Sequence, residues 1–234
     1  MQLFTREWGS GERRAVLVHG AMSDSRTWHR LGPALAARGF HVTAVDLRGH
    51  GRSPRAAEYT PALFADDLVE SVAARPDLVI GHSLGGLALG LALDRLQPRR
   101  AVFIDPAWTW PGFGRLHRLV VAPTTWLVVH APRPVLRLHY PRWDAQDVTI
   151  EIEGRRAFDP AVARRLHAVG DVAAPAAMIV PSLVVTAGRS EFVPPPLAER
   201  LRALGFEVHV DPSAGHAVHR ENLPGLLALL DRWL

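Results

Sequence analysis

A glycine-rich turn around one serine is the part of this sequence best suited to covalent chemistry. Gly81-His82-Ser83-Leu84-Gly85-Gly86 follows the apolar stretch 78–80 and precedes the Leu-, Ala- and Gly-rich stretch 84–96. A strand, a G-x-S-x-G turn and a helix form the sharp bend that exposes a nucleophilic serine. The bend leaves little room for side chains two residues before and after the serine, and glycine occupies both positions. We therefore expect Ser83 to be a nucleophile.

A serine hydroxyl becomes a good nucleophile only when a neighbouring base removes its proton. His216 is the expected base, because it lies in the loop that follows the apolar stretch 207–210. A loop at the carboxyl end of a strand is where sheet enzymes of this kind place their catalytic groups. His219, three residues further on, is the rival candidate. We expect His82 to point away from Ser83, and His19 to order a loop by hydrogen bonding.

The base needs a carboxylate to orient it, and two candidates keep the chain order serine, acid, histidine. Glu191 follows the expected strand 182–186, and we favour it as the acid of the triad. Asp105 ends the expected strand 101–104 and is the alternative, with a turn or helix cap before Pro106 as its simpler role. Asp211 is expected only to shape the loop of His216.

Two backbone N–H groups must also face the oxygen on which charge develops. Leu84 supplies one of them, because it directly follows the nucleophile at the start of a helix. A strand at 15–18 ends in the turn His19-Gly20-Ala21, which would present the N–H of Ala21 as the second. Met22 is then expected in the wall of the pocket.

Strands and helices alternate toward both ends of the chain, which indicates a mainly parallel sheet covered on both faces. We expect strands at 15–18, 41–45, 78–80, 101–104, 182–186 and 207–210. We expect helices at 28–38, 61–74, 84–96, 196–204 and 223–234. The sequence therefore predicts the α/β fold class.

The alternation stops in the middle of the chain. Residues 108–181 carry four of the seven tryptophans and scattered prolines, with helix candidates at 115–121, 135–140, 144–157 and 160–169. A connection of this length is expected to have structure of its own. We predict an α/β core formed by 1–106 and 181–234, and a helical cap insertion formed by 107–180.

Composition excludes several classes of site. The 234 residues include no cysteine, so disulfides, thiolate metal sites and cysteine nucleophiles are excluded. All 27 basic residues are arginine and the net charge is +4, but the arginines are dispersed, so we expect no nucleic-acid partner. Residues 1–11 lack a signal-peptide core, and the apolar stretch 119–129 is too short to span a bilayer. We expect a soluble, cytoplasmic protein without a membrane partner.

Taken together, four blocks resemble the α/β-hydrolase superfamily over essentially the whole chain. They are His19-Gly20, the turn 81–86, Gly215-His216 and the loop 45–53, in which Gly49 and Gly51 are expected to fix a turn. The resemblance implies an α/β-hydrolase fold. This family usually has aspartate as the acid, so glutamate at 191 departs from its pattern. Serine at the turn argues against dehalogenase and epoxide hydrolase activity, since those relatives attack with aspartate.

The resulting hypothesis is a hydrolase that cleaves carboxylic esters of small to medium apolar substrates through an acyl-enzyme, without cofactor or metal. Aromatic residues of the expected cap are candidates for an apolar pocket, or for packing between cap and core: Trp108, Trp110, Phe113 and Trp126. A C–C bond hydrolase or a lactonase could use the same triad. A ligand-binding protein without turnover is the alternative from a different class.

Overall fold

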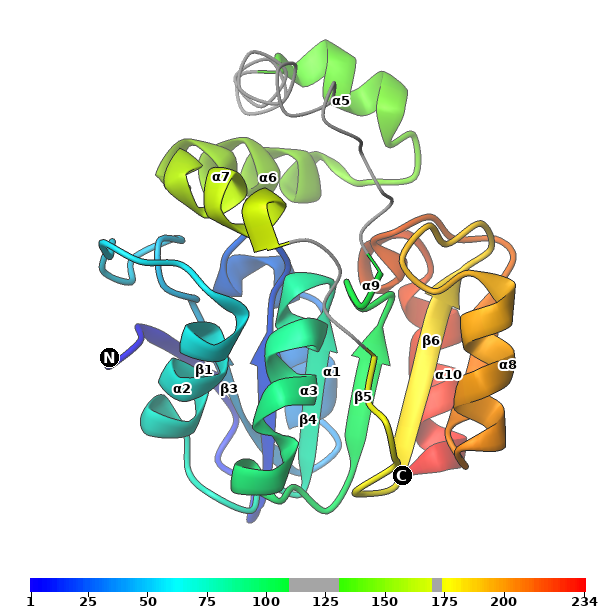
Figure 1. The fold of residues 1–234 in the computed structure, drawn as a ribbon. Helices are drawn as coiled ribbons and strands as arrows, with labels where there is room; N and C mark the ends of the chain where they lie inside the picture. The colour runs from blue at the N-terminus through cyan, green and yellow to red at the C-terminus, as the bar shows by residue number, and fades with distance from the viewer. Residues whose placement is uncertain (110–130, 170–173) are drawn as a thin grey trace.

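The computed structural model describes residues 1–109, 131–169 and 174–234 of the chain. Within them, seven strands form one sheet in the order β1-β3-β2-β4-β5-β6-β7 (Figure 1). β1 (Thr5–Trp8) pairs antiparallel with β3 (Phe40–Val45), and every other neighbouring pair is parallel. The remaining strands are β2 (Arg13–Val18), β4 (Leu78–His82), β5 (Ala101–Ile104), β6 (Ser182–Ala187) and β7 (Glu207–Asp211).

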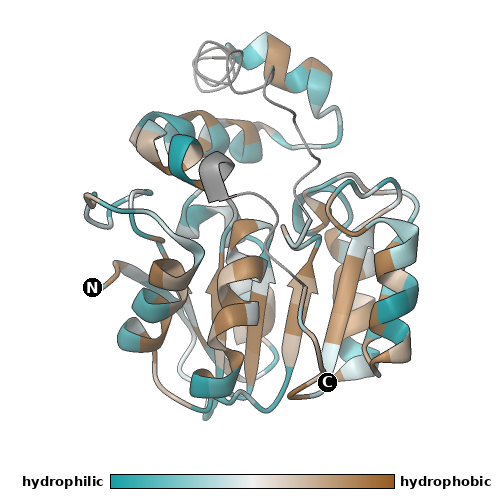
Figure 2. Cartoon of the chain, viewed as in Figure 1, coloured by the Kyte–Doolittle hydropathy of each residue, from teal (hydrophilic) through white to brown (hydrophobic). Residues whose placement is uncertain are grey.

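Alternate residues of the central strands enter two separate apolar layers, because successive side chains of a strand point to opposite faces. In β2, Val16 and Val18 pack on the face that is covered by α2 (Pro61–Ser71), α3 (Leu84–Leu96) and α8 (Pro195–Ala203). Ala15 and Leu17 pack on the other face, which α1 (Leu31–Ala36) and α10 (Leu223–Trp233) cover. Figure 2 shows that the strands are largely brown, whereas the helices around them mix brown, white and teal. The predicted α/β fold is confirmed.

The helix expected at 28–38 is wrong in its extent. The segment forms the 3₁₀ helix η1 (Ser25–Trp28), which is capped by the side chain of Asp24, and then the separate helix α1. The physical reason is Pro33, which has no N–H to donate to the carbonyl of His29 in a continuous helix. Strand β1 and the short helix α9 (Val218–Glu221) were not expected from the sequence.

Three helices lie between β5 and β6 in the described part of the chain: α5 (Arg133–His139), α6 (Ala145–Ala157) and α7 (Pro160–Val169). α6 and α7 lie over the carboxyl ends of the strands (Figure 1). We call these three helices the cap helices; the division of the chain into core and cap domains stays a prediction. The helix candidate at 115–121 lies outside the described residues. No helix of the described ranges combines the length and the apolar character needed to cross a membrane.

The connections of β2 and β4 create the place for a site. The chain leaves β2 toward β3 and leaves β4 toward β5, which lie in opposite directions along the sheet. In open α/β sheets, ligands bind at the carboxyl ends of the strands where this direction changes. Here, that point brings the turn after β2 beside the turn after β4: a Cβ added to Gly20 would lie 3.0 Å from the Cβ of Ser83.

Candidate active site

Ser83 lies on a tight bend between β4 and α3. Its backbone angles are φ 51° and ψ −116°, a conformation that costs free energy for any residue with a side chain. The bend also excludes side chains two residues before and two residues after the serine. A Cβ on Gly81 would lie 2.6 Å from the carbonyl oxygen of Gly85, and a Cβ on Gly85 would lie 2.2 Å from that of Val18. The predicted strand, turn and helix around Ser83 are confirmed.

His216 forms a hydrogen bond with Asp105. Its Nδ1 lies 2.6 Å from Oδ2 of Asp105, whose side chain is 2% exposed. The other carboxylate oxygen, Oδ1, accepts the N–H of Ala187 at 3.3 Å. An ionised carboxylate can only accept, so Nδ1 of His216 carries the proton of this bond. The arrangement fixes both the tautomer and the orientation of the imidazole.

The preferred choice of carboxylate is therefore corrected. Glu191 is exposed, and in the described part of the chain its side chain makes neither a hydrogen bond nor an ion pair with His216. The alternative, Asp105, holds that position because it directly follows β5, whereas Glu191 comes four residues after the end of β6. Asp105 also has a positive φ of 42°, which turns the chain at this point.

Ser83 and His216 line one cavity of about 210 Å³. Within the described residues, no direct hydrogen bond links the Ser83 hydroxyl to the imidazole. Catalytic hydrogen bonds are often long without substrate, so the geometry remains compatible with proton transfer between these groups. The cavity brings together the nucleophile and the base that the sequence predicted from distant parts of the chain.

Two further histidines pack beside His216. The ring of His82 lies 4.6 Å from that of His216 and 4.7 Å from that of His219, measured between ring centroids. Nε2 of His82 donates to the backbone carbonyl of His216 at 3.0 Å. Burial lowers the pKa of both His82 and His219 well below its usual value. These rings are therefore neutral around pH 7, and they help to position His216.

The rival base, His219, also lines the cavity but has a different partner. Its Nε2 lies 3.0 Å from the hydroxyl of Thr27. Among the described residues, the structure records no hydrogen bond from His219 to a carboxylate, so nothing orients this ring as Asp105 orients His216. The geometry favours His216 over His219 as a base.

His19 orders the turn after β2, as expected. Its Nδ1 donates to the carbonyl of Gly20 at 2.7 Å, and its Nε2 accepts the N–H of Leu47 at 2.9 Å. This buried ring places Ala21 in the wall of the cavity, together with Met22. Leu84 opens α3, where the first N–H groups of a helix lack partners within the helix. The roles of the Ala21 and Leu84 N–H groups as an oxyanion hole stay a prediction.

The aromatic residues expected in the pocket lie elsewhere or outside the described residues. Trp108 is buried in the core, where its ring packs 4.8 Å from that of Phe103. The other three, Trp110, Phe113 and Trp126, fall within 110–130, which the structure does not describe. Instead, two stacked rings from the α5–α6 region form part of the wall: Tyr140 and Trp143, with centroids 3.9 Å apart.

Three charged side chains, which the sequence analysis did not single out, complete the wall. They are Glu151 and Arg155 of α6 and Arg220 of α9. Glu151 accepts hydrogen bonds from Nε of Arg155 at 2.8 Å and from Nη1 of Arg220 at 2.7 Å. The guanidinium of Arg220 also lies 4.3 Å from the centroid of the Trp143 ring. The cavity thus combines aromatic walls with a buried ionic cluster.

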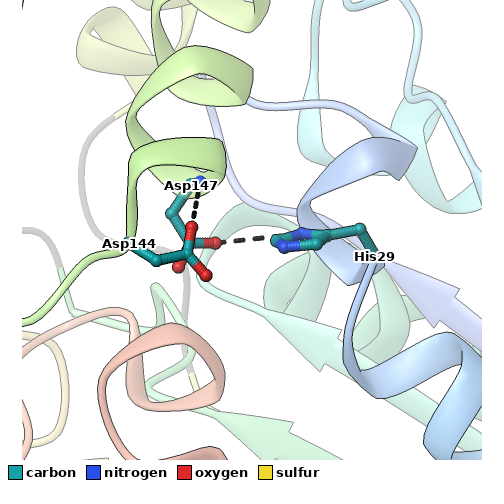
Figure 3. Close-up of side chains that lie close together, drawn as sticks. All are labelled: His29, Asp144 and Asp147. Atoms are coloured by element: carbon teal, nitrogen blue, oxygen red, sulfur yellow. Dashed lines mark hydrogen bonds and ion pairs between the residues drawn. The ribbon is translucent and has the colours of Figure 1, made fainter.

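A second cluster joins the cap helices to η1 and α1. Figure 3 shows His29 facing Asp144 and Asp147, whose potential ligand atoms lie within 4.8 Å of one another. Nη2 of Arg30 lies 2.5 Å from Asp147, and Nε of Arg220 lies 3.9 Å from it. Two guanidinium groups so close oppose the binding of a metal cation. We therefore assign this cluster to the contact between cap helices and core.

Comparison with known proteins agrees with this geometry. The chain is 40% identical to salicylic acid-binding protein 2 of Nicotiana tabacum over 97 residues, which are 38% of this chain and 37% of that protein. It is 34% identical to polyneuridine aldehyde esterase of Rauvolfia serpentina over 99 residues, which are 40% of this chain and 38% of that one. The chain thus spans about two fifths of the length of these curated relatives.

A solved structure shows the same fold over nearly the whole chain. The structure of a thermophilic esterase from Thermogutta terrifontis matches 99% of this chain and 92% of its own, with a TM-score of 0.73 and 18% identity. The model of the alpha/beta hydrolase family matches residues 15–227, which include Ser83, Asp105 and His216. This chain belongs to the alpha/beta hydrolase family.

Proposed function

We propose that this chain is a serine hydrolase that cleaves carboxylic esters. Ser83 is the nucleophile, His216 the general base, and Asp105 the carboxylate that orients the base. One observation carries the proposal: His216 is hydrogen-bonded to the buried Asp105 and lines the same cavity as Ser83, which stands on a strained bend. Esterase relatives support the same reaction class.

The proposed reaction transfers an acyl group to the serine and then to water. Asp105 holds the proton of Nδ1, so Nε2 of His216 can take the proton of Ser83 while the serine oxygen attacks the carbonyl carbon. The N–H groups of Ala21 and Leu84 hold the oxyanion. His216 then protonates the leaving alcohol, next deprotonates a water molecule, and finally returns a proton to Ser83 as the acid leaves. This chemistry needs no cofactor or metal.

The proposed substrate is a small to medium ester. A cavity of about 210 Å³ limits the part of the substrate that it can enclose. Tyr140, Trp143 and Met22 give this cavity apolar walls, which supports the expectation of an apolar chain next to the ester. A small molecule is the partner that a cavity of this size fits.

Three other expectations remain proposals. We propose a cytoplasmic location. We propose that the chain has no nucleic-acid partner, because its arginines are dispersed rather than gathered in a basic patch. We also propose the division into a core of 1–106 and 181–234 and a cap of 107–180. The cap helices over the strand ends support that division.

The test replaces the nucleophile. Ser83→Ala should reduce p-nitrophenyl butyrate hydrolysis by at least about 10⁴-fold, with the circular dichroism spectrum unchanged. The exposed Ser10 provides the matched control, and Ser10→Ala should keep full activity. A fluorophosphonate probe should label Ser83, as mass spectrometry of the tryptic peptide would show. Turnover that survives in Ser83→Ala would refute the mechanism, and a folded protein that resists the probe would point to ligand binding without catalysis.

A further inference from the structure

The loop that carries His216 connects β7 to α9. It spans residues 212–217, which belong to neither a strand nor a helix. The side chain of His216 is 40% exposed, so packing alone does not hold the ring in place. A catalytic group must be kept within about 0.5 Å of its working position, because small displacements cost much of the rate. The loop therefore needs polar contacts that fix its backbone.

Glu221 supplies one of these contacts. Its Oε2 accepts the N–H of Gly215, the residue directly before the base, at 2.8 Å. A Cβ on Gly215 would lie 3.1 Å from both carboxylate oxygens, so the glycine lets the carboxylate approach the loop closely. Glu221 is the last residue of α9, and its own N–H donates to the carbonyl of Ala217 at 3.0 Å. Both the main chain and the side chain of Glu221 are thus bonded to the loop.

His82 holds the other side of the base. Its Nε2 donates to the backbone carbonyl of His216 at 3.0 Å. The peptide groups before Gly215 and after His216 are therefore both anchored, the first by Glu221 and the second by His82. The ring itself is bonded through Nδ1 to Asp105. Three hydrogen bonds, from α9, from β4 and from the turn after β5, thus fix the backbone and the ring of the base.

The neighbouring residue Asn222 ties the loop at its start. Its Nδ2 donates to Oδ2 of Asp211, the last residue of β7, at 2.6 Å. Oδ1 of Asp211 accepts the N–H and the hydroxyl of Ser213, at 2.9 and 2.7 Å. These contacts fix the beginning of the loop, three or more residues before the base. The bond from Glu221 acts on the backbone next to the base.

We propose that Glu221 is a positioning residue for the general base. Its carboxylate holds the backbone at Gly215, so that Nε2 of His216 stays aligned with the reacting oxygens. The inference rests on the proposed ester hydrolysis and adds a residue to its machinery. The role requires a hydrogen-bond acceptor at the reach of a glutamate side chain, rather than a negative charge. The amide oxygen of glutamine has this reach, whereas the aspartate side chain is one methylene shorter.

Departure of the alcohol is a step that depends closely on this alignment. When the C–O bond of the tetrahedral intermediate breaks, its electron pair passes to the alcohol oxygen, which takes the proton from Nε2 of His216. The ethoxide group of ethyl butyrate needs this proton in order to leave. p-Nitrophenolate leaves as a stable anion and needs it far less. Because the two butyrate esters share one acyl group, the ratio of their kcat/KM values reports how well the base delivers its proton.

The experiment measures this ratio, ethyl butyrate over p-nitrophenyl butyrate, in variants of Glu221. Glu221→Ala and Glu221→Asp should lower it by about tenfold or more, a loss within the range of general acid catalysis. Glu221→Gln should keep it within about twofold of the wild type. Glu199→Ala on α8 is the matched control, because Glu199 is exposed and the substitution is the same, and it should leave the ratio unchanged.

The ratio separates positioning from a loss of stability. Both esters are measured in one preparation, so a smaller amount of folded enzyme cancels, and Glu221→Asp provides the measurement if the alanine variant does not fold. A wild-type ratio in Glu221→Asp would overturn the inference, and so would an equal fall in Glu221→Gln.

The two proposals can fail separately. If Ser83→Ala still hydrolyses both esters, the proposed function fails. If hydrolysis depends on Ser83 while the ratio is the same in all the Glu221 variants, only the positioning role proposed here is wrong.

Discussion

Asp105 and His216 are 111 positions apart in the chain and are joined by a hydrogen bond of 2.6 Å. Asp105 directly follows β5 and His216 follows β7, so the bond joins the carboxyl ends of two strands that β6 separates. The second oxygen of Asp105 is bonded to the N–H of Ala187, at the end of β6. The carboxylate is thus held on both oxygens, and its buried position keeps water from competing for them.

This double attachment makes Asp105→Asn a sharp test of the triad. The Ala187 N–H requires an acceptor, so the amide oxygen of the new side chain should take that place. The amide NH₂ then faces Nδ1 of His216 and forces the proton of the ring onto Nε2. A ring in that tautomer cannot accept the proton of Ser83. We expect kcat for p-nitrophenyl butyrate to fall by about 10⁴-fold.

Glu191→Gln is the matched control for this prediction. Its side chain is exposed, and no hydrogen bond to His216 is recorded for it in the described part of the chain. We expect kcat and KM to stay within about twofold of the wild type, in line with surface substitutions. If Glu191→Gln lost activity while Asp105→Asn kept it, Glu191 rather than Asp105 would be the carboxylate that orients His216.

The bend that carries Ser83 could be predicted from the sequence because the steric demand is local. Gly81, Ser83 and Gly85 lie within five positions, and the same short stretch determines both the bend and the need for glycine. The acid could not be decided in this way. Asp105 and Glu191 both follow strands in the required chain order, and only the three-dimensional course of the two loops separates them.

The sequence analysis did not single out the charged residues in the wall of the cavity, although those of α6 follow a regular spacing in the sequence. Asp147, Glu151 and Arg155 recur at intervals of four residues, so they share one face of α6. All three are buried, as is Val148 beside them. A helical face of charged residues is usually solvated, and nothing in the local pattern says that this face contacts the core. That information depends on how the cap helices lie over the sheet.

Gly85→Ala should be strongly destabilising. The new Cβ would lie 2.2 Å from the carbonyl oxygen of Val18, a backbone atom of β2 that cannot move aside without shifting the strand. We expect the free energy of unfolding to fall by about 3 kcal/mol, as for severe overpacking. Urea denaturation followed by circular dichroism measures this change.

Gly90→Ala on the same helix is the control for that substitution. At Gly90 the nearest atom to an added Cβ is Nε1 of Trp108, at 3.3 Å, and the backbone φ is ordinary. The gain in helix propensity of about 1 kcal/mol offsets the slight crowding. We expect stability to stay within about 1 kcal/mol of the wild type. Equal losses in the two variants would show that crowding at the bend is not the cause.

His50 should make stability depend on pH. The ring is buried against Phe158, and burial lowers its pKa to about 3. In the unfolded chain the pKa returns to about 6.5, so between these values the unfolded state binds a proton that the folded state does not. The free energy of unfolding therefore decreases as the pH falls below about 6.5. The contribution of this one residue is about 1.4 kcal/mol per pH unit within that window.

His50→Asn removes this contribution while its amide can still donate to the Arg48 carbonyl, as Nδ1 of the imidazole does at 2.8 Å. We expect the variant to lose less stability than the wild type between pH 6 and pH 5, by about 1 kcal/mol, in urea titrations at both values. The free energy of unfolding at pH 7 also depends on packing, so only its change between pH 6 and pH 5 is compared. Parallel pH profiles for the two proteins would mean that the His50 ring is protonated in the folded state, against its burial.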